Sequence, residues 1–321
     1  MTEKNNDDSR IRVGISSCLL GFKVRYDSGH KHDRYITDVL GPYFKFVPVC
    51  PEVEVGMTVP RESVKLSGDI ESPRMVGNKT GTDWTEKMSK FVAMRTKQLE
   101  KEKLSGYILK KDSPSCGMER VKVYSGSQAV RKGRGFWGGA LLDHFPLMPV
   151  EEEGRLNDAR LRDNFIVRVF SYHRLQNLFE GHFSRKAVVE FHTAHKYLML
   201  AHSPKHYKEL GQLVAAMAKT STAEFKTEYM KLFMEGLGRK TTVKKNVNVL
   251  QHILGFLKKQ LDPGDKKYIL QQIDDYHNFL VPLVVPLTLI KHYIYKHDVE
   301  YVMNQVYLNP HPKELMLRNH V

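Results

Sequence analysis

The chain has 321 residues, more than one ordinary domain of about 100–200 residues, so we expect two domains. Apolar residues make up 41% of it and charged residues 27%, a balance that excludes a wholly disordered protein. The formal net charge of +14 excludes an acidic protein and favours a polyanionic partner: nucleic acid, a nucleotide or a membrane surface.

The sequence does not have the pattern of a membrane or secreted protein. No stretch reaches the roughly 18 apolar residues that a membrane span requires. The best candidate, 279–290, contains Pro282 and Pro286 and predicts a buried helix pair or a kinked core segment. Residues 1–10 are polar, so we expect disorder there and no secretory signal. We therefore expect a cytoplasmic protein with no membrane partner and no obligate protein partner.

The first part of the chain alternates strand and helix signals. Short runs rich in apolar and β-branched residues predict three strands, at 11–16, 44–49 and 107–109. A short helix fits 29–41, and apolar residues at a 3.6-residue spacing predict a longer helix that Asp83 caps and Ser105 ends. This alternation is typical of an α/β domain. We expect a small Rossmann-like parallel sheet within residues 11–155.

The second part of the chain has helical periodicity throughout. A charged run that ends in glycine, EEEG at 151–154, suits a domain boundary. Beyond it, the spacing of apolar residues predicts six helices, at 161–179, 184–201, 204–219, 222–236, 243–261 and 265–278. We therefore expect residues 156–321 to form an all-α domain.

The three cysteines of the chain all lie in the first part, and each follows a predicted strand or its extension. They are Cys18, Cys50 and Cys116. In an open parallel sheet, ligands bind beyond the carboxyl ends of the strands. The three thiols are therefore expected to meet at one site, although they are far apart in sequence.

Three thiolates favour a soft metal, which can be zinc, copper(I) or an iron–sulfur cluster. A structural zinc site normally has four protein ligands, often in C-x-x-C pairs, and this chain has no such pair. A 4Fe–4S cluster held by three cysteines leaves one iron without a protein ligand, and that iron can act as a Lewis acid. A three-cysteine zinc site with an open fourth position fits the same ligand count, so the spacing leaves both alternatives open.

Polar side chains flank the thiols. Glu52 lies two residues after one cysteine, and serines precede another; a carboxylate and a hydroxyl beside a Lewis-acidic metal can position water and move protons. We expect the remaining nearby polar residues to contact the substrate: Ser17, Asp27 and Ser115.

Several motifs give the sequence a family resemblance. ISSCLLG, RYDSGH, PVCPEVEVGM and KKDSPSCG resemble the thiouracil desulfurase family known as TudS, over about residues 11–155. YHRLQNLFEGH, AHSPKHYKELG and NVLQHILGFLKKQL resemble the YbgA-like domain of unknown function. The two domains in this order resemble the RudS-type fusion, which is associated with removing sulfur from 4-thiouridine in tRNA.

The resemblance implies a cofactor and an activity. It implies a 4Fe–4S cluster bound by three cysteines, with one iron not ligated by protein, and catalytic roles for Glu52 and Ser113. The implied reaction is a non-redox, hydrolytic desulfuration of tRNA 4-thiouridine to uridine that releases hydrosulfide. One position departs from the family pattern: where K-H-x-N-V-L is expected, Lys245 is followed by Asn246. The implied cluster ligands are Cys18, Cys50 and Cys116.

The net positive charge is larger in the second part, where residues 158–321 carry 24 Lys and Arg against 15 Asp and Glu. Clustered cations near aromatic residues favour phosphate and base contacts with RNA. The expected RNA-binding residues are Arg131, Lys132, Arg134, Lys196, Lys205, Arg239, Lys240, Lys244 and Lys245. Two other functions fit the same residues: desulfuration of free thiolated pyrimidines or 4-thiouridine monophosphate, and a non-catalytic iron–sulfur regulator that binds nucleic acid.

Overall fold

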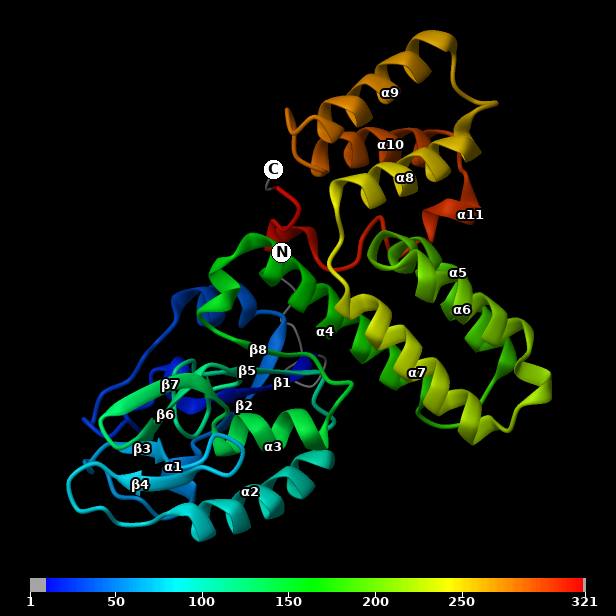
Figure 1. Cartoon of the computed structure of the whole chain (residues 1–321). Coiled ribbons are helices and arrows are strands. Elements are labelled where there is room, and N and C mark those ends of the chain that lie inside the picture. The colour runs from blue at the N-terminus through cyan, green and yellow to red at the C-terminus, as the bar shows by residue number, and fades with distance from the viewer. Residues whose placement is uncertain (1–9, 320–321) are drawn as a thin grey trace. The chain divides into compact units, whose positions relative to one another are not determined.

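The computed structural model describes residues 10–319 (Figure 1). The chain forms two compact units, the first ending at Asp158 and the second beginning at Ala159, and each is described by itself. The disorder expected for residues 1–10 falls, except for Arg10, outside the described residues.

A four-stranded parallel sheet forms the centre of the first unit. Its strands are β1 (Ile11–Ser16), β2 (Phe44–Val49), β5 (Gly106–Leu109) and β8 (Val150–Glu152), in the order β2-β1-β5-β8. The side chains of Val13 and Ile15 are fully buried, as expected for parallel strands covered on both faces. The predicted α/β fold is therefore confirmed, and the three predicted strands are all present.

Helices complete this unit. They are η2 (Ser17–Leu20), η3 (Tyr35–Leu40), α1 (Pro51–Glu54), α2 (Thr85–Glu100), α3 (Phe136–His144) and η4 (Arg155–Asn157). The prediction that Asp83 caps α2 agrees with the structure in part: Trp84 is the N-cap, while the Asp83 carboxylate accepts a 2.9 Å hydrogen bond from the backbone N–H of Thr85. The helix ends five residues before Ser105, because the chain turns at 101–103 and Lys103 has a positive φ of 49°.

A second, mixed sheet was not predicted from the sequence. It contains β3 (Val64–Ser67), β4 (Arg74–Gly77), β6 (Val121–Ser125) and β7 (Gln128–Gly133), in the order β4-β3-β6-β7. These strands are short and charged on one face, and every residue of β7 before Gly133 is exposed. No continuous apolar run therefore marks them, although Leu66, Met75 and Val123 are buried.

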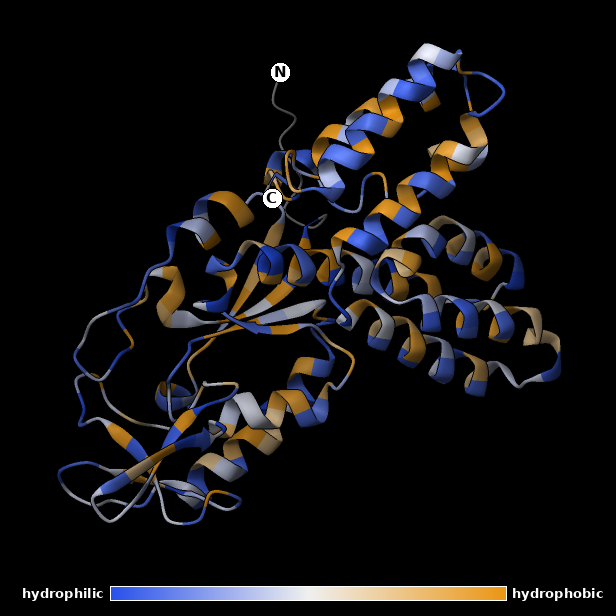
Figure 2. Cartoon of the chain, turned by 45° about the horizontal axis from the view of Figure 1, so that its top comes forward, coloured by the Kyte–Doolittle hydropathy of each residue, from blue (hydrophilic) through white to orange (hydrophobic). Residues whose placement is uncertain are grey.

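The second unit is helical, as predicted, and Figure 2 shows hydrophobic residues gathered along one side of many of its helices. Each of the six predicted helices is present. The helices are α4 (Ala159–Phe179), α5 (Arg185–His202), α6 (Pro204–Ala215), η5 (Met217–Lys219), α7 (Thr222–Gly238), α8 (Val243–Leu254), η6 (Gly255–Leu257), α9 (Pro263–His277), α10 (Val284–Lys296), α11 (Glu300–Met303) and η7 (Lys313–Leu315).

Local signals explain several helix ends and one difference from prediction. Ser184, Ser203, Ser221, Thr242 and Asp262 are N-caps whose side chains accept a backbone N–H of the first turn. The kinked segment expected at 279–290 is instead a turn followed by one helix, α10, because Pro286 lies in the first turn, where its missing N–H removes no helical hydrogen bond. Among the described helices, none has the length and apolar character that crossing a membrane needs.

Candidate active site

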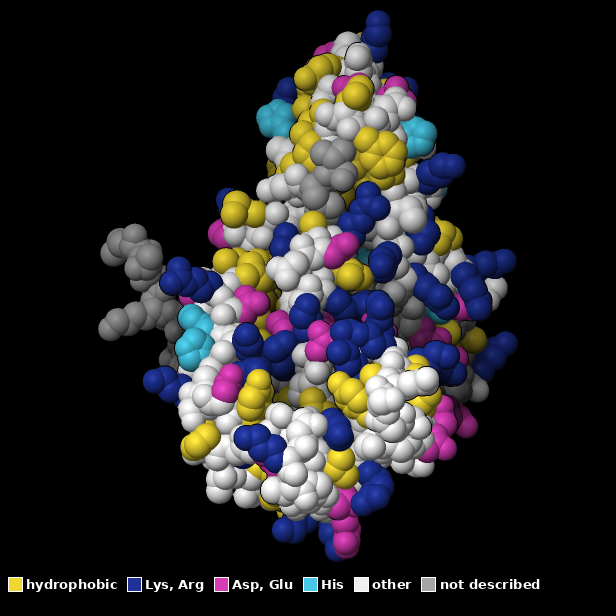
Figure 3. Space-filling view, turned by 60° about the vertical axis from the view of Figure 1, so that its left-hand side comes forward, with side chains coloured by type: hydrophobic (Ala, Val, Ile, Leu, Met, Phe, Trp, Pro, Cys, Tyr) yellow, Lys and Arg dark blue, Asp and Glu magenta, His cyan; other side chains and the backbone are white. Residues whose placement is uncertain are grey.

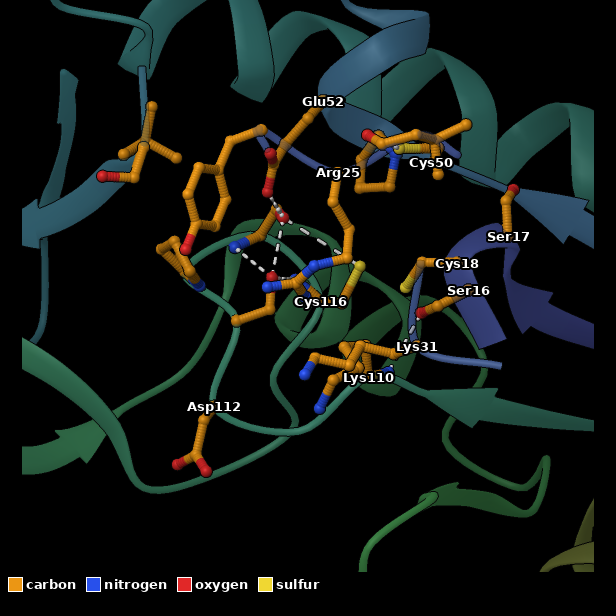
Figure 4. Close-up of a pocket in the computed structure, with 18 of the residues that line it drawn as sticks. Ser16, Ser17, Cys18, Arg25, Lys31, Cys50, Glu52, Lys110, Asp112 and Cys116 are labelled. Atoms are coloured by element: carbon orange, nitrogen blue, oxygen red, sulfur yellow. Dashed lines mark hydrogen bonds between the residues drawn. The ribbon is translucent and has the colours of Figure 1, made fainter. Parts of the chain in front are cut away.

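The three cysteines lie in loops that follow neighbouring strands. Cys18 lies in η2, directly after β1, and Cys50 follows β2 and is the N-cap of α1. Cys116 lies in the loop after β5. All three border one cavity of about 290 Å³, around which Figure 4 shows their side chains. The structure therefore brings together the three thiols that the sequence analysis grouped.

Burial opposes ionisation of these thiols. It raises the pKa of Cys18 to about 11, with a smaller contribution from the nearby Cys50, and it raises the pKa of Cys50. Burial also raises the pKa of Cys116 well above its ordinary value, to which charge on the other two cysteines adds. Three thiolates at this site therefore require a positively charged group among them.

The arrangement is open and not a closed tetrahedral site. Among residues 10–319, no three His, Cys, Asp or Glu side chains converge closely enough to hold one metal ion. The three thiols instead stand around a cavity that other residues also line.

A backbone contact fixes the loop that carries Cys116. The backbone N–H of Trp137 donates to the carbonyl of Ser115 at 2.8 Å, and that of Gly135 donates to the carbonyl of Gly117 at 2.8 Å. A Cβ on Gly138 would lie 2.6 Å from the carbonyl oxygen of Cys116, so only glycine permits this approach. The start of α3 thus holds the cysteine loop against it.

Glu52 lies beside the thiols in a fixed hydrogen-bond network. Its Oε1 accepts a 2.6 Å hydrogen bond from the Ser115 hydroxyl, and its Oε2 accepts one of 3.1 Å from Arg61 Nε. Both side chains of the ion pair are largely buried, with 15% of Glu52 and 7% of Arg61 exposed. Arg61 also donates to the carbonyl of Val24 at 3.0 Å. Because Oε2 also accepts a hydrogen bond from Arg61 Nη2, the carboxylate has a single orientation, and Oε1 keeps a free lone pair.

Ser113 shapes the turn that presents Cys116. Its Oγ accepts hydrogen bonds from the backbone N–H of Ser115 at 3.3 Å and of Cys116 at 3.1 Å. The two serine hydroxyls lie 3.0 Å apart, so a chain of hydrogen bonds runs from Ser113 through Ser115 to Glu52. Figure 4 shows these bonds as dashed lines.

The other two predicted contact residues differ in their positions. Ser17 is buried and lines the cavity. Asp27 is not among the lining residues; its carboxylate accepts a 3.0 Å hydrogen bond from the backbone N–H of Gly29 and lies 3.5 Å from Arg25 Nε.

Five cations that line the cavity were not selected from the sequence. They are Arg25, Lys31, Arg61, Lys110 and Lys111. Lys110 stands in the KKDSPSCG motif, which could have revealed it. Arg61 had no such signal, because its pairing with Glu52 depends on a loop that closes only in the folded chain.

The expected RNA-binding residues of the first unit lie on and just after β7. Arg131 and Lys132 are exposed on this strand. Arg131 lies 3.2 Å from Asp112, which lines the cysteine cavity, and Arg134 lies 3.0 Å from Asp143. Figure 3 shows Lys and Arg side chains on the surface of the molecule, with Asp and Glu among them.

Two of the expected RNA-binding residues of the helical unit, Lys240 and Lys244, line a cavity of about 420 Å³ in that unit. Lys245 points elsewhere: its Nζ donates to the carbonyls of His202 at 2.7 Å and of Lys240 at 3.1 Å.

The remaining three lie at other places in the unit. Lys196 lies 4.6 Å from the ring centroid of Tyr301, and Lys205 Nζ lies 3.7 Å from a carboxylate oxygen of Glu209. Arg239 ends α7. None of these three residues is among those that line the cavity beside Lys240 and Lys244.

Two known families match separate parts of the chain. The 2-thiouracil desulfurase family matches residues 13–153, and a family of unknown function, DUF1722, matches residues 196–312. The uncharacterized protein YbgA of Escherichia coli (strain K12) is 28% identical over 165 residues, which cover 51% of this chain and 98% of YbgA.

Two further proteins are similar to a part of the chain. The uncharacterized protein YbbK of Bacillus subtilis (strain 168) is 30% identical over 149 residues, which cover 45% of this chain and 97% of YbbK. A solved structure, the [4Fe-4S]-dependent thiouracil desulfidase TudS, is 27% identical with a TM-score of 0.38, covering 46% of this chain and 95% of that one. Through residues 13–153, the chain belongs to the 2-thiouracil desulfurase family, and it joins this domain to a DUF1722 domain.

Proposed function

We propose that the chain removes sulfur from 4-thiouridine in tRNA, with a 4Fe–4S cluster bound by Cys18, Cys50 and Cys116. One observation carries the proposal: three thiols at neighbouring strand ends and the carboxylate of Glu52 border the same cavity. The family match supports a thiouracil-type substrate, and the similar TudS structure is named for its [4Fe-4S] dependence.

The donor set fits such a cluster. Thiolates are the usual protein ligands of iron–sulfur clusters, and positive charge offsets the cost of placing thiolates at the buried Cys18 and Cys116 and the half-buried Cys50. A group of several metal atoms needs ligands around a cavity, whereas one zinc ion needs ligands that meet at a point. When bound through three cysteines, the cluster supplies a thiophilic Lewis acid for the thiocarbonyl sulfur.

Glu52 is suited to act on water. Arg61 and Ser115 hold its carboxylate in place, so a free lone pair can orient a water molecule and accept its proton as the water attacks C4 of the pyrimidine. The thiocarbonyl and water become a carbonyl and hydrogen sulfide, released as hydrosulfide and a proton. The reaction balances without an oxidant or a reductant.

The two serines complete the polar side of the cavity. Ser115 donates a hydrogen bond to Glu52, and the Ser113 hydroxyl lies 3.0 Å from that of Ser115. When a substrate is bound, the Ser113 hydroxyl can donate instead to an acceptor on the base. Such a hydrogen bond stabilises charge that develops on the ring during attack.

The rim of the cavity supports a nucleotide substrate. Arg25, Lys31 and Lys111 line it, and Tyr26, which is 42% exposed, offers a ring for stacking. These groups favour a phosphorylated substrate over a bare base. Free 4-thiouridine monophosphate remains a second candidate, since a cavity of about 290 Å³ suits one nucleotide.

The test compares substrates on the full chain loaded with iron and sulfide under anaerobic conditions. We expect thiolated tRNA to lose its 4-thiouridine and release equal sulfide, faster than 4-thiouridine monophosphate or 2-thiouracil does. Raising the salt concentration should weaken tRNA binding. The logarithm of the binding constant should fall with the logarithm of the salt concentration, with a slope of about −0.7 to −0.9 per phosphate contact. Equal rates for tRNA and the free nucleotide at all salt concentrations favour the second candidate, and tRNA binding without sulfide release indicates a regulator.

A further inference from the structure

The helical unit contains a cavity of about 420 Å³ that the proposed desulfuration does not use. Residues from separate elements form it: Asp163 of α4, the start of α8, Tyr276 at the end of α9, and Arg318 near the end of the chain. It brings cations, an acidic group and an aromatic wall into one space.

Cations lie at one side of this cavity. Lys240 and Lys244 are exposed and stand on either side of Thr242, the N-cap of α8. The first backbone N–H groups of a 12-residue helix have no carbonyl partners within it, so they add partial positive charge there. This side of the cavity suits a phosphate group.

Arg318 is the buried cation of the cavity, with only 8% of the residue exposed. Its Nη1 donates to the carbonyl of Tyr307 at 2.7 Å, and its guanidinium carbon lies 5.0 Å from that ring's centroid. Within residues 10–319, no other acceptor lies within hydrogen-bond distance of its guanidinium, and no carboxylate forms an ion pair with it. Its other N–H groups can donate to a ligand that enters the cavity.

Asp163 adds an acceptor without a donor. Its Oδ1 is buried and, in the described part of the chain, accepts no hydrogen bond; His311 Nε2 lies 3.6 Å away. A carboxylate repels a plain anion, so this group disfavours inorganic phosphate as the ligand. It suits a ligand that also carries an O–H or N–H donor.

An apolar wall lies beside these polar groups. Phe279 is 57% exposed and, with Leu283, lines the cavity. Asn246, which also lines the cavity, donates a hydrogen bond to the Tyr276 hydroxyl and accepts one from the Tyr307 hydroxyl, each at 3.1 Å. These bonds fix the position of the Asn246 side chain. The departure from the family pattern at position 246 is therefore a buried structural contact in this chain.

We propose that this cavity binds a nucleotide. Its phosphate lies at Lys240, Lys244 and the start of α8, its base packs against Phe279, and a ribose hydroxyl or base N–H donates to Asp163. The nucleotide is an unpaired residue of an RNA strand or a free nucleoside monophosphate, because both present the same groups. The proposal goes beyond desulfuration and requires no cluster.

The experiment measures binding to the full chain by calorimetry with uridine monophosphate, adenosine monophosphate, inorganic phosphate and an unthiolated single-stranded oligoribonucleotide. In Lys240→Ala/Lys244→Ala we expect nucleotide affinity to fall by at least about tenfold. Asp163→Asn should weaken nucleotide binding and strengthen phosphate binding. The control Lys186→Ala, an exposed lysine outside the cavity, should bind like the wild type.

Photocrosslinking with 5-iodouridine monophosphate identifies the cavity, since we expect the crosslinked peptide to contain Phe279. Free nucleotides that bind as tightly as the oligoribonucleotide identify a free nucleotide as the ligand; binding of the oligoribonucleotide alone identifies a strand. Nucleotide affinity unchanged in Lys240→Ala/Lys244→Ala, or phosphate binding as tight as nucleotide binding, overturns the proposal. If the loaded wild-type chain binds nucleotides but does not desulfurate thiolated tRNA, the proposed function is contradicted. The proposal that the helical cavity binds a nucleotide is then unaffected.

Discussion

The first unit gathers its thiols and carboxylate at the ends of neighbouring strands, whereas the helical unit gathers its cations at the ends of helices. The strand-end cavity is lined by nucleophilic and acid–base groups whose loops are fixed by backbone hydrogen bonds. The helical cavity has no thiol among its lining residues and contains charged groups that suit a ligand. We expect the first cavity to serve the reaction and the second to serve binding. Variants in one cavity should therefore remove its function and leave that of the other cavity unchanged.

Removing one thiol should have the largest effect. Cys18→Ala, Cys50→Ala and Cys116→Ala each leave two thiolates, too few to retain the cluster, so bound iron, bound sulfide and turnover should fall to background. Nucleotide binding in the helical unit should stay at the wild-type value, measured by calorimetry on a variant whose circular dichroism shows that it is folded. Wild-type iron content in Cys116→Ala contradicts the three-thiol site.

Replacing the acid–base group should leave the cluster intact. We expect the turnover rate of Glu52→Gln to fall by a factor of about 10²–10⁴. The amide has the shape of the carboxylate and can form hydrogen bonds, but it cannot accept a proton from water. Iron content should match the wild type. Glu62→Gln is the matched control, since Glu62 binds the backbone at Lys79 and Thr80 and does not line the cavity. Equal losses in both variants contradict a role for Glu52 in the reaction.

The helical unit should lose stability in acid. Burial lowers the pKa of His202 to about 4, although its hydrogen bond with the carbonyl of Arg239 opposes this shift. The folded state therefore prefers neutral His202. The contribution of neutral His202 to the free energy of unfolding is complete above the pKa of unfolded histidine, about 6.5. This contribution, roughly 3 kcal/mol, is lost as the pH falls toward 4.

Hydrogen exchange of α5 in the full chain at pH 7, 6 and 5 measures this loss. His202→Gln can keep a donor for the Arg239 carbonyl without a titrating group, so its α5 should be less sensitive to pH than that of the wild type. His195, whose pKa burial lowers to about 3, retains a part of the dependence. The same pH dependence in both proteins contradicts the assignment to His202.

A smaller effect should come from the glycine beneath the cysteine loop. The Cβ of Gly138→Ala would meet the carbonyl oxygens of Gly117 at 2.5 Å and Cys116 at 2.6 Å, so the loop must move, at a cost of about 1–3 kcal/mol. We expect weaker iron retention during dialysis. Gly139→Ala is the control, because its nearest neighbours are Arg134 side-chain atoms at 3.7 Å and beyond. Equal iron loss in both variants contradicts the packing of α3 against this loop.

The sequence could predict the cysteine site because its signals are local. Strong strand patterns at 11–16 and 44–49 end directly at or beside a cysteine, and the parallel arrangement then brings these ends together. It could not predict β3, β4, β6 and β7, which bury one face only.

Contacts between distant residues were also beyond sequence reasoning. Arg61 and Glu52 meet because a loop folds back, and the helical cavity joins Asp163 to Arg318, 155 positions away along the chain. Neither pairing follows from spacing or propensity. Lys245 makes a contact of the same kind, because its ammonium donates to the backbone carbonyl of His202, and the RNA contact that its basic pattern favours stays a prediction.

Single-turnover sulfide release is the most direct measurement of the central claim. The full chain, anaerobically loaded and freed of unbound metal, is mixed with thiolated tRNA while bound iron, bound sulfide and released sulfide are quantified. We predict about four iron and four sulfide per chain and one hydrosulfide released per 4-thiouridine lost. Equal release from metal-free chain, or from Cys116→Ala, contradicts the account.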